Sequence, residues 1–221
     1  MSEEVQFNML RPFGPRIGHV KCPSFVIDRL IEITDDLIKN KDYESAGKHL
    51  VGIIEDEPHI QIEEEKNLYE FFNGILRHYV HSVLEEFQYL PPDKLAQCTL
   101  ATGIKDMWSV HMKPNEYNPL HHHTFCNVSS VLYLKVPNNE SRNIPNKTER
   151  DGNITVVDHT SWPESLDNGV YEIKPEVGSM YLWPAHILHT VYPFLGNEER
   201  RSVAWNGAFQ LSNEDGEILL G

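Results

Sequence analysis

Apolar residues recur at helical spacing through residues 24–40 and again through residues 63–89. Side chains that pack on one face of a helix recur every three or four positions, so each pattern predicts an amphipathic helix. A shorter helix is expected over residues 43–57, although two glycines weaken it. We therefore expect residues 1–95 to form a helical extension that packs on the rest of the chain.

The pattern changes after residue 95. Short runs rich in β-branched and aromatic residues alternate with clusters of turn-forming residues, which is typical of antiparallel strands. Helices followed by many short strands predict an α+β, mainly β fold, in which a helical layer backs a jelly roll of residues 96–221 within one structural domain. A polar loop is expected over residues 137–153. The strands are expected near residues 97–102, 107–112, 129–136, 153–158, 169–174, 179–184, 188–193 and 200–210.

Composition and charge narrow the classes of function. The chain has 221 residues, of which 40% are hydrophobic, enough for a packed core. Its formal net charge of −14 repels phosphate backbones, so we do not expect nucleic acid as a partner. No apolar run reaches the roughly 18 residues of a membrane span, and the acidic start MSEEVQFNML is unlike a secretory signal. The sparse, odd set of three cysteines argues against a disulfide scaffold, and we expect a cytoplasmic protein with no membrane partner.

Three consecutive histidines precede the strand expected near residues 129–136. Alternate residues of an extended segment project to the same side, so His121 and His123 can point together. Two neutral imidazoles converging from one strand end form half of a metal site, and a third ligand must come from elsewhere. His189 and His186, in a short turn before a later strand, are both candidates. A His-x-His pair alone is a weak motif, because a solvated surface triplet would look the same.

A second cluster follows His189 by eleven positions. Arg200 and Ser202 alternate along an expected strand and share a face. A guanidinium beside a hydroxyl forms a fork that can bind a carboxylate through two hydrogen bonds. The competing interpretation is a structural ion pair between Arg200 and Glu198 or Glu199.

Four segments follow one another in order between roughly residues 105 and 210: HHH, SSVLYL, GSMYLWPAHILHTV and EERRSVAWN. Their order and spacing resemble the 2-oxoglutarate/Fe(II)-dependent oxygenase superfamily. More narrowly, they are similar to a prolyl-hydroxylase-like family of oxygenases from phages and marine bacteria. The resemblance implies a double-stranded β-helix core of the jelly-roll or cupin type, with Fe(II) as cofactor and 2-oxoglutarate as cosubstrate.

The resemblance implies that His121, His123 and His189 bind the iron, and it favours His189 over His186. Most of the superfamily has a carboxylate where this chain has His123. Two arrangements follow from this departure. The metal has three histidine ligands, which we favour, or it takes a carboxylate from elsewhere, with Asp158 as the candidate.

The resemblance also implies roles around the cosubstrate. Arg200 and Ser202 would bind the distal carboxylate of 2-oxoglutarate, and the Tyr133 hydroxyl would reach the same carboxylate. His111, on the preceding strand, would line the cosubstrate pocket. The catalytic set is then the three iron-binding histidines together with Arg200.

The expected reaction is hydroxylation of a C–H bond in a peptidyl or small-molecule substrate by O2, with release of succinate and CO2. A three-histidine cupin-type dioxygenase that does not use 2-oxoglutarate would share the barrel and the His-x-His pair, but it would not need Arg200 with Ser202. A non-catalytic jelly-roll binding protein would need neither set. The sequence leaves the oligomeric state open.

Overall fold

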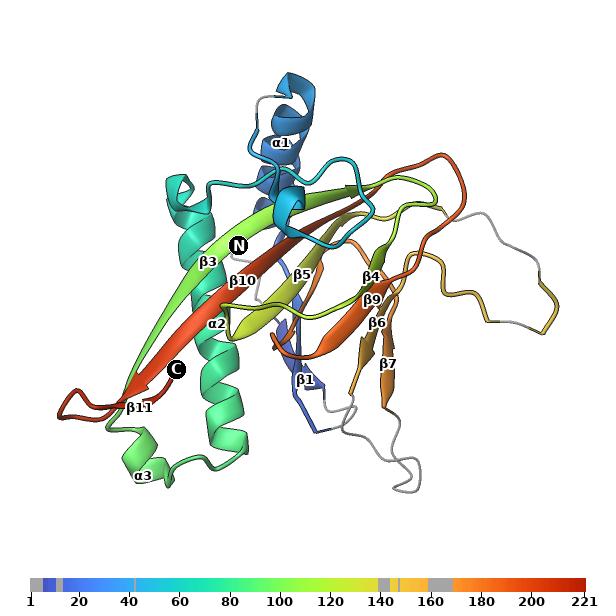
Figure 1. Ribbon diagram of the computed structural model, residues 1–221. Coiled ribbons are helices and arrows are strands. Elements are labelled where there is room, and N and C mark those ends of the chain that lie inside the picture. The colour runs from blue at the N-terminus through green and yellow to red at the C-terminus, as the bar shows by residue number, and fades with distance from the viewer. Residues whose placement is uncertain (1–5, 11–13, 42, 139–143, 147, 159–168) are drawn as a thin grey trace.

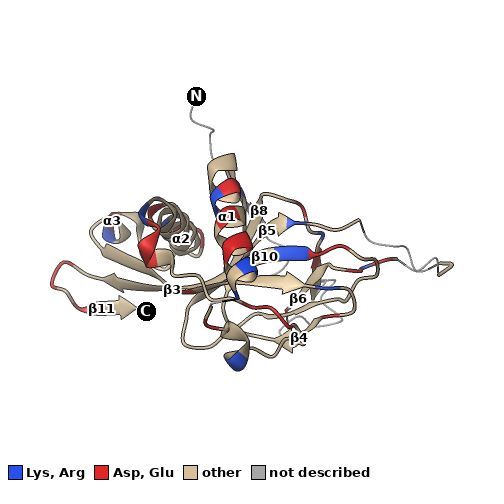
Figure 2. Cartoon of the chain, turned by 90° about the horizontal axis from the view of Figure 1, so that it is seen from above, with Lys and Arg blue, Asp and Glu red and all other residues tan. Residues whose placement is uncertain are grey.

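The computed structural model describes residues 6–10, 14–41, 43–138, 144–146, 148–158 and 169–221. These residues form three layers. Helices cover one face of a large antiparallel sheet, and a smaller sheet packs against its other face (Figure 1, Figure 2). The chain is therefore mainly β, with a jelly-roll core and helices packed on it, as the alternation of strand and turn signals predicts.

The major sheet has seven strands. Its order is β1-β2-β8-β5-β10-β11, and β3 pairs with β10 outside this path. β3 and β10 form the longest strand pairing, which extends over the whole of both strands and crosses the molecule diagonally in Figure 1. The strands are β1 (Gln6–Leu10), β2 (Ile17–Lys21), β3 (Thr99–Met112), β5 (Val128–Lys135), β8 (Ser179–Pro184), β10 (Arg200–Ser212) and β11 (Ile218–Leu220).

The minor sheet has four strands in the order β4-β9-β6-β7. They are β4 (Asn118–His121), β9 (Leu188–Val191), β6 (Ile154–Val157) and β7 (Val170–Ile173). β4 and β9 pair antiparallel so that His121 lies opposite His189. The sheet thereby brings together two histidines that are far apart in the sequence.

The helices are α1 (Ser24–Asn40), α2 (Lys66–Glu86) and α3 (Pro92–Leu95), with 3-10 turns η1 (Ala46–His49) and η2 (Ile62–Glu64). An apolar cluster between helices and major sheet includes Leu30 of α1, Phe72 of α2 and Trp205 of β10. A second cluster, which includes Val131 and Trp183, fills the space between the two sheets. Burial of these side chains supplies most of the driving force for stacking the layers. None of the helices in the described residues has the length and apolar character needed to cross a bilayer.

Most of the expected elements are present. The helices over residues 24–40 and 63–89 correspond to α1 and α2, and the two strands expected near 97–102 and 107–112 are one continuous strand, β3. The remaining expected strands correspond to β5 through β10. Part of the loop expected over residues 137–153 lies outside the described residues.

Two expectations for the N-terminal part are wrong. The helix expected over residues 43–57 is absent apart from the short η1. Its backbone bonds instead to residues of β3 and the following turn, with Ile53 N donating to Tyr117 O (2.9 Å) and His111 N donating to Asp56 O (3.0 Å). The second difference is that β1 and β2 extend the major sheet, because β2 pairs with β8. The N-terminal part is thus not purely helical.

Candidate metal centre and cosubstrate cavity

Three histidines converge at the end of the minor sheet. His121 ends β4, His189 lies on β9, and His123 follows β4, where its backbone N–H donates to Ala185 O (2.9 Å). One ring nitrogen from each of the three lies within 4.8 Å of the other two. Such a spacing allows one cation to contact all three imidazoles.

The second nitrogen of each ring faces a hydrogen-bond acceptor. His121 Nδ1 lies 2.7 Å from Pro119 O, and His189 Nδ1 lies 3.1 Å from Ile187 O. His123 Nδ1 lies 2.6 Å from Asn206 Oδ1. A carbonyl oxygen can only accept, so these contacts place the proton on Nδ1 and leave a lone pair on each Nε2. Three unprotonated ring nitrogens within 4.8 Å of one another form a set of ligands that a transition metal can bind.

The three imidazoles are neutral at physiological pH. Burial lowers the pKa of His123 to about 4, and burial together with the other two imidazoles holds the pKa of His189 well below its usual value. Burial also lowers the pKa of His121. Neutral rings are the form that binds a metal, so folding prepares the ligands without the need to remove protons at pH 7.

The structure distinguishes His189 from the alternative ligand His186, and His123 from the alternative ligand Asp158. His186 is exposed, whereas His189 is buried. Among the described residues, the group able to hold a metal contains His123 and does not contain Asp158. The arrangement with three histidines is therefore the one that the geometry supports.

A small inner cavity of about 50 Å³ adjoins the histidine group. Its walls include the three histidines, both Arg200 and Ser202, and two tryptophans, Trp108 and Trp183. The cavity lies between the two sheets, because its lining comes from β3, β5, β8 and β10 on one side and β4, β6 and β9 on the other. The two clusters expected from the sequence therefore share one cavity.

Arg200 is the unusual residue of this cavity. Its side chain is 1% exposed. Nε donates to Gly152 O (3.1 Å) and Nη1 donates to Ser202 Oγ (3.3 Å), while Nη2 has no partner. Tyr133, whose ring lies 5.0 Å from the guanidinium, has a buried hydroxyl that makes no hydrogen bond of normal geometry but lies close enough to the guanidinium to interact with it. Within the described part of the chain, Arg200 forms no ion pair with a carboxylate, so the alternative pairing with Glu198 or Glu199 is wrong.

A buried guanidinium without an anion is costly, because burial removes its hydration without replacing it. Burial accordingly lowers the pKa of Arg200. Arg200 Nη2 and the Tyr133 hydroxyl make no hydrogen bond of normal geometry, so both can donate to one anionic group. The site is therefore arranged for a small carboxylate or a similar anion.

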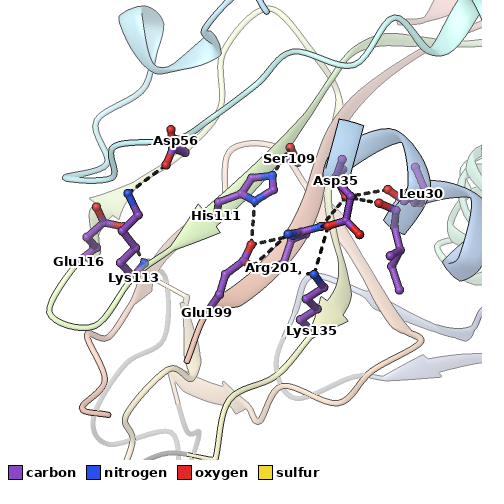
Figure 3. A network of polar contacts seen from close by, with 12 residues as sticks. Leu30, Asp35, Asp56, Ser109, His111, Lys113, Glu116, Lys135, Glu199 and Arg201 are labelled. Carbon is purple, nitrogen blue, oxygen red and sulfur yellow. Dashed lines mark hydrogen bonds and ion pairs between the residues drawn. The ribbon is translucent and has the colours of Figure 1, made fainter. Parts of the chain in front are cut away.

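His111 does not reach this cavity, and the expectation that it lines the cosubstrate pocket is not supported. It lies opposite Arg201 across β3 and β10, so it shares the face of Arg201 and not that of Arg200. Its ring contacts Ser109 Oγ (2.9 Å) and Glu199 Oε1 (2.7 Å), as Figure 3 shows. His111 thus belongs to a polar network on the other face of the sheet.

That network ties α1 to β10 (Figure 3). Arg201 forms two hydrogen bonds with Glu199, at 2.7 and 3.0 Å, and one with Thr34 of α1 (3.0 Å). It also pairs with Asp35, which in turn contacts Lys135. Burial alone would raise the pKa of Glu199, but the hydrogen bonds from His111 and Arg201 lower it to about 2. Every charge in this network has an opposite partner.

An outer chamber of about 630 Å³ also adjoins the histidine group. It shares His121, His123 and Trp108 with the inner cavity, and it is bounded by residues of η1 and by Phe125, which is 97% exposed. A molecule in this chamber would lie next to the histidine group without occupying the space beside Arg200.

Sequence reasoning assigned no role to three polar residues next to His123. Asn206, Ser129 and Asp106 are neighbours on adjacent strands. Asn206 lies within the segment EERRSVAWN, which is the signal that singles it out, but the sequence does not reveal that it faces His123.

A comparison with protein families shows which family part of the chain resembles. Residues 106–206 match the family model described as "Putative 2OG-Fe(II) oxygenase". This segment contains the histidine group, Arg200, Ser202 and Tyr133. No curated protein matches the chain in sequence.

Several solved structures resemble the fold. A non-heme alpha ketoglutarate dependent epimerase, SnoN from nogalamycin biosynthesis, is 12% identical, with a TM-score of 0.50 over 88% of this chain and 80% of that chain. A prolyl-4-hydroxylase from Pseudomonas putida is 15% identical, with a TM-score of 0.49 over 85% of this chain and 89% of that chain. A 2OG-Fe(II) oxygenase family oxidoreductase from Burkholderia pseudomallei is 14% identical, with a TM-score of 0.37 over 49% of this chain, which spans 45% of that protein. At such identities the likeness is one of fold.

Proposed function

We propose that this chain, whose residues 106–206 match the 2OG-Fe(II) oxygenase family, hydroxylates a C–H bond of a peptidyl or small-molecule substrate and converts 2-oxoglutarate to succinate and CO2. One observation carries the proposal. The cavity that three converging imidazoles line also contains Arg200, a buried guanidinium with no carboxylate partner among the described residues, and the ring of Tyr133 lies 5.0 Å from that guanidinium. The combination supplies one site for a metal and one for the anionic end of a cosubstrate.

The three histidines fit an iron ion by their chemistry. All three are neutral, each offers an Nε2 lone pair, and their nitrogens lie within 4.8 Å of one another. Imidazole is a suitable ligand for Fe(II), and three protein ligands leave other positions on the metal open. His121, His123 and His189 would hold the ion, and the site would carry one more positive charge than one with two histidines and one carboxylate.

The buried polar atoms fit 2-oxoglutarate. Its distal carboxylate can accept hydrogen bonds from Arg200 Nη2 and the Tyr133 hydroxyl, neither of which makes a hydrogen bond of normal geometry in the structure. Ser202, which already accepts from Arg200 Nη1, would hold the guanidinium in position. A carboxylate at this point would neutralise the buried charge and remove its desolvation cost.

When bound, Fe(II) and 2-oxoglutarate supply the oxidative chemistry that activates O2 and inserts oxygen into a C–H bond. The protein's own residues bind, orient and exclude water. Trp108, Trp183 and Val191 line the inner cavity with apolar surface, which strengthens the electrostatic attraction between Arg200 and a carboxylate. The substrate would enter through the outer chamber, which borders His121 and His123 but does not include Arg200 in its lining.

The competing enzyme, a three-histidine cupin-type dioxygenase without 2-oxoglutarate, gives no reason for an unpaired Arg200. A non-catalytic jelly roll would need neither the metal ligands nor the guanidinium. Both alternatives therefore leave the cost of the buried charge unexplained.

Turnover of 2-oxoglutarate without added substrate tests the proposal. Protein purified anaerobically and loaded with Fe(II) is mixed with air and 2-oxoglutarate labelled at C1. The labelled CO2 and the unlabelled succinate that are released are both measured. We expect release by the wild type, background release by His189→Ala and Arg200→Met, and unchanged release by His186→Ala, which alters an exposed histidine. Wild-type protein that binds iron but releases no succinate, or equal release by all variants, would contradict the proposal.

A further inference from the structure

Three polar side chains lie side by side on the major sheet beneath His123. Asn206 of β10 is flanked by Asp106 of β3 and by Ser129 of β5, each directly opposite it in the strand register. Residues directly opposite on neighbouring antiparallel strands project to the same face and contact each other. The sheet therefore fixes the order Asp106, Asn206, Ser129 under the histidine ring.

The side chains form a continuous chain of hydrogen bonds. Asp106 Oδ1 accepts from Asn206 Nδ2 (2.9 Å), and His123 Nδ1 lies 2.6 Å from Asn206 Oδ1. Ser129 Oγ is a second, longer neighbour of the same ring nitrogen, at 3.1 Å. Asn206 is buried, with 8% of its surface exposed, whereas Asp106 is half-buried, and both residues lie in the wall of the outer chamber.

The direction of the chain is set at its carboxylate end. An ionised carboxylate only accepts, so the amide group that faces Asp106 must be the NH2 group. The amide oxygen of Asn206 must then face His123, and because that oxygen only accepts, His123 must carry its proton on Nδ1. A rotated amide would present NH2 to His123, favour a proton on Nε2 and remove the lone pair that faces the other two histidines.

We propose that Asp106 and Asn206 are positioning residues that hold His123 in the tautomer and orientation required of a metal ligand. The proposal rests on the proposed function, because it assumes that His123 binds the metal. We call the hydrogen-bonded chain from Asp106 through Asn206 to His123 the relay. Through it, the negative charge of Asp106, which would not contact the metal, compensates for the missing carboxylate ligand. A partner that accepts a proton from a ligating histidine raises its basicity and fixes its ring.

The test measures metal affinity and does not depend on activity. Metal-free protein is titrated with Co(II), whose binding is followed in the visible spectrum, for the wild type and four variants. Asn206→Ala removes the acceptor, and Asp106→Asn keeps the volume but frees the amide to rotate. The double variant Asp106→Asn with Asn206→Asp exchanges donor and acceptor, and Ser129→Ala removes only the longer contact of His123.

We expect Asn206→Ala to weaken Co(II) binding about 10–100-fold, the range for loss of a hydrogen bond to a ligating histidine, and Asp106→Asn to weaken it less. The double variant should return to within about threefold of the wild type, since the carboxylate introduced at position 206 would accept both from His123 and from the amide introduced at position 106. Ser129→Ala should bind like the wild type. A purely structural role for Asn206 predicts no such rescue.

Nitrogen chemical shifts of the His123 ring in the metal-free protein give a second reading. We expect a proton on Nδ1 in the wild type and in the double variant, and a mixture of tautomers in Asp106→Asn. Equal Co(II) affinity in the wild type, Asn206→Ala and Asp106→Asn, or an unchanged tautomer in Asp106→Asn, would overturn the relay. Wild-type protein that binds no Co(II) would instead contradict the proposed function. If Asn206→Ala does not fold, the comparison of Asp106→Asn with the double variant still tests the relay, because neither changes the side-chain volume.

Discussion

Arg200 and Arg201 are neighbours on β10, are almost completely buried, and differ in every other respect. Arg201 projects toward α1 and has opposite charges on Glu199 and Asp35. Arg200 projects between the two sheets, and its polar and aromatic contacts within the described segments are a carbonyl, a hydroxyl and the face of a tyrosine ring. Removing one member of a buried charge network destabilises the fold, because its partners lose their counter-charge, whereas a buried charge that has no counter-charge points to a ligand site.

The largest difference is expected in the stability of the two methionine variants. Arg201→Met leaves Glu199 and Asp35 without their main partner and should lower the free energy of unfolding by about 3 kcal/mol. Arg200→Met replaces an unpaired buried charge with an apolar side chain of similar length, so its effect should be neutral or stabilising by about 1 kcal/mol. Urea denaturation of the metal-free proteins measures both. Equal destabilisation would mean that Arg200 also stabilises the fold through its own contacts.

Much of this contrast was accessible from the sequence, because alternation along a strand places adjacent residues on opposite faces. The same rule, together with the histidine triplet, predicted the pairing of His121 with His123 and the face shared by Arg200 and Ser202. His111 was misplaced because its face depends on the register between β3 and β10, which pairs it with Arg201. Such a register is set by contacts between distant segments, and the local pattern does not contain it.

The N-terminal part was predicted less well for a related reason. Residues 43–57 have some helical periodicity, but their backbone groups bond to a strand that lies some 50 or more residues later in the chain. Tertiary pairing overrides weak local propensity, particularly where glycines reduce it. Asn206 was visible in its motif, yet its role depends on two cross-strand neighbours and a histidine that only the fold brings together.

The free energy of unfolding at acidic pH tests the contribution of the ion pair between Glu199 and Arg201. The pKa of Glu199 is about 2, below its ordinary value of 4.5, so its contribution is present above pH 4.5 and is lost as pH falls toward 2. With allowance for its partial exposure, this contribution should be about 2 kcal/mol. Glu199→Gln should be less stable than the wild type at pH 7 and should show a flatter profile between pH 5 and 2. Parallel profiles for the two proteins would show that the pairing contributes nothing.

Glu57 should have a smaller effect on stability than Glu199, with a pH dependence of the opposite sign. It is 1% exposed, and one of its oxygens has no partner. Burial, with a minor contribution from Glu116, raises its pKa to about 7, so the wild type should lose stability as pH rises from 4.5 to 7. Glu57→Gln should be more stable than the wild type by about 1 kcal/mol at pH 8 and nearly equal to it at pH 4.5. Thermal unfolding at the two pH values measures this, and a variant that is destabilised at pH 8 would contradict the assignment.

The central claim is that one cavity holds a metal on three histidines and a carboxylate on Arg200. Calorimetric titration of 2-oxoglutarate into Fe(II)-loaded protein under anaerobic conditions tests it most directly, with Arg200→Met and metal-free wild type as comparisons. We expect the loaded wild type to bind one molecule of 2-oxoglutarate per chain, and each comparison to bind it at least tenfold more weakly, a loss of about 1.4 kcal/mol or more. Binding that is absent from the loaded wild type, or equally strong in Arg200→Met, would contradict the account.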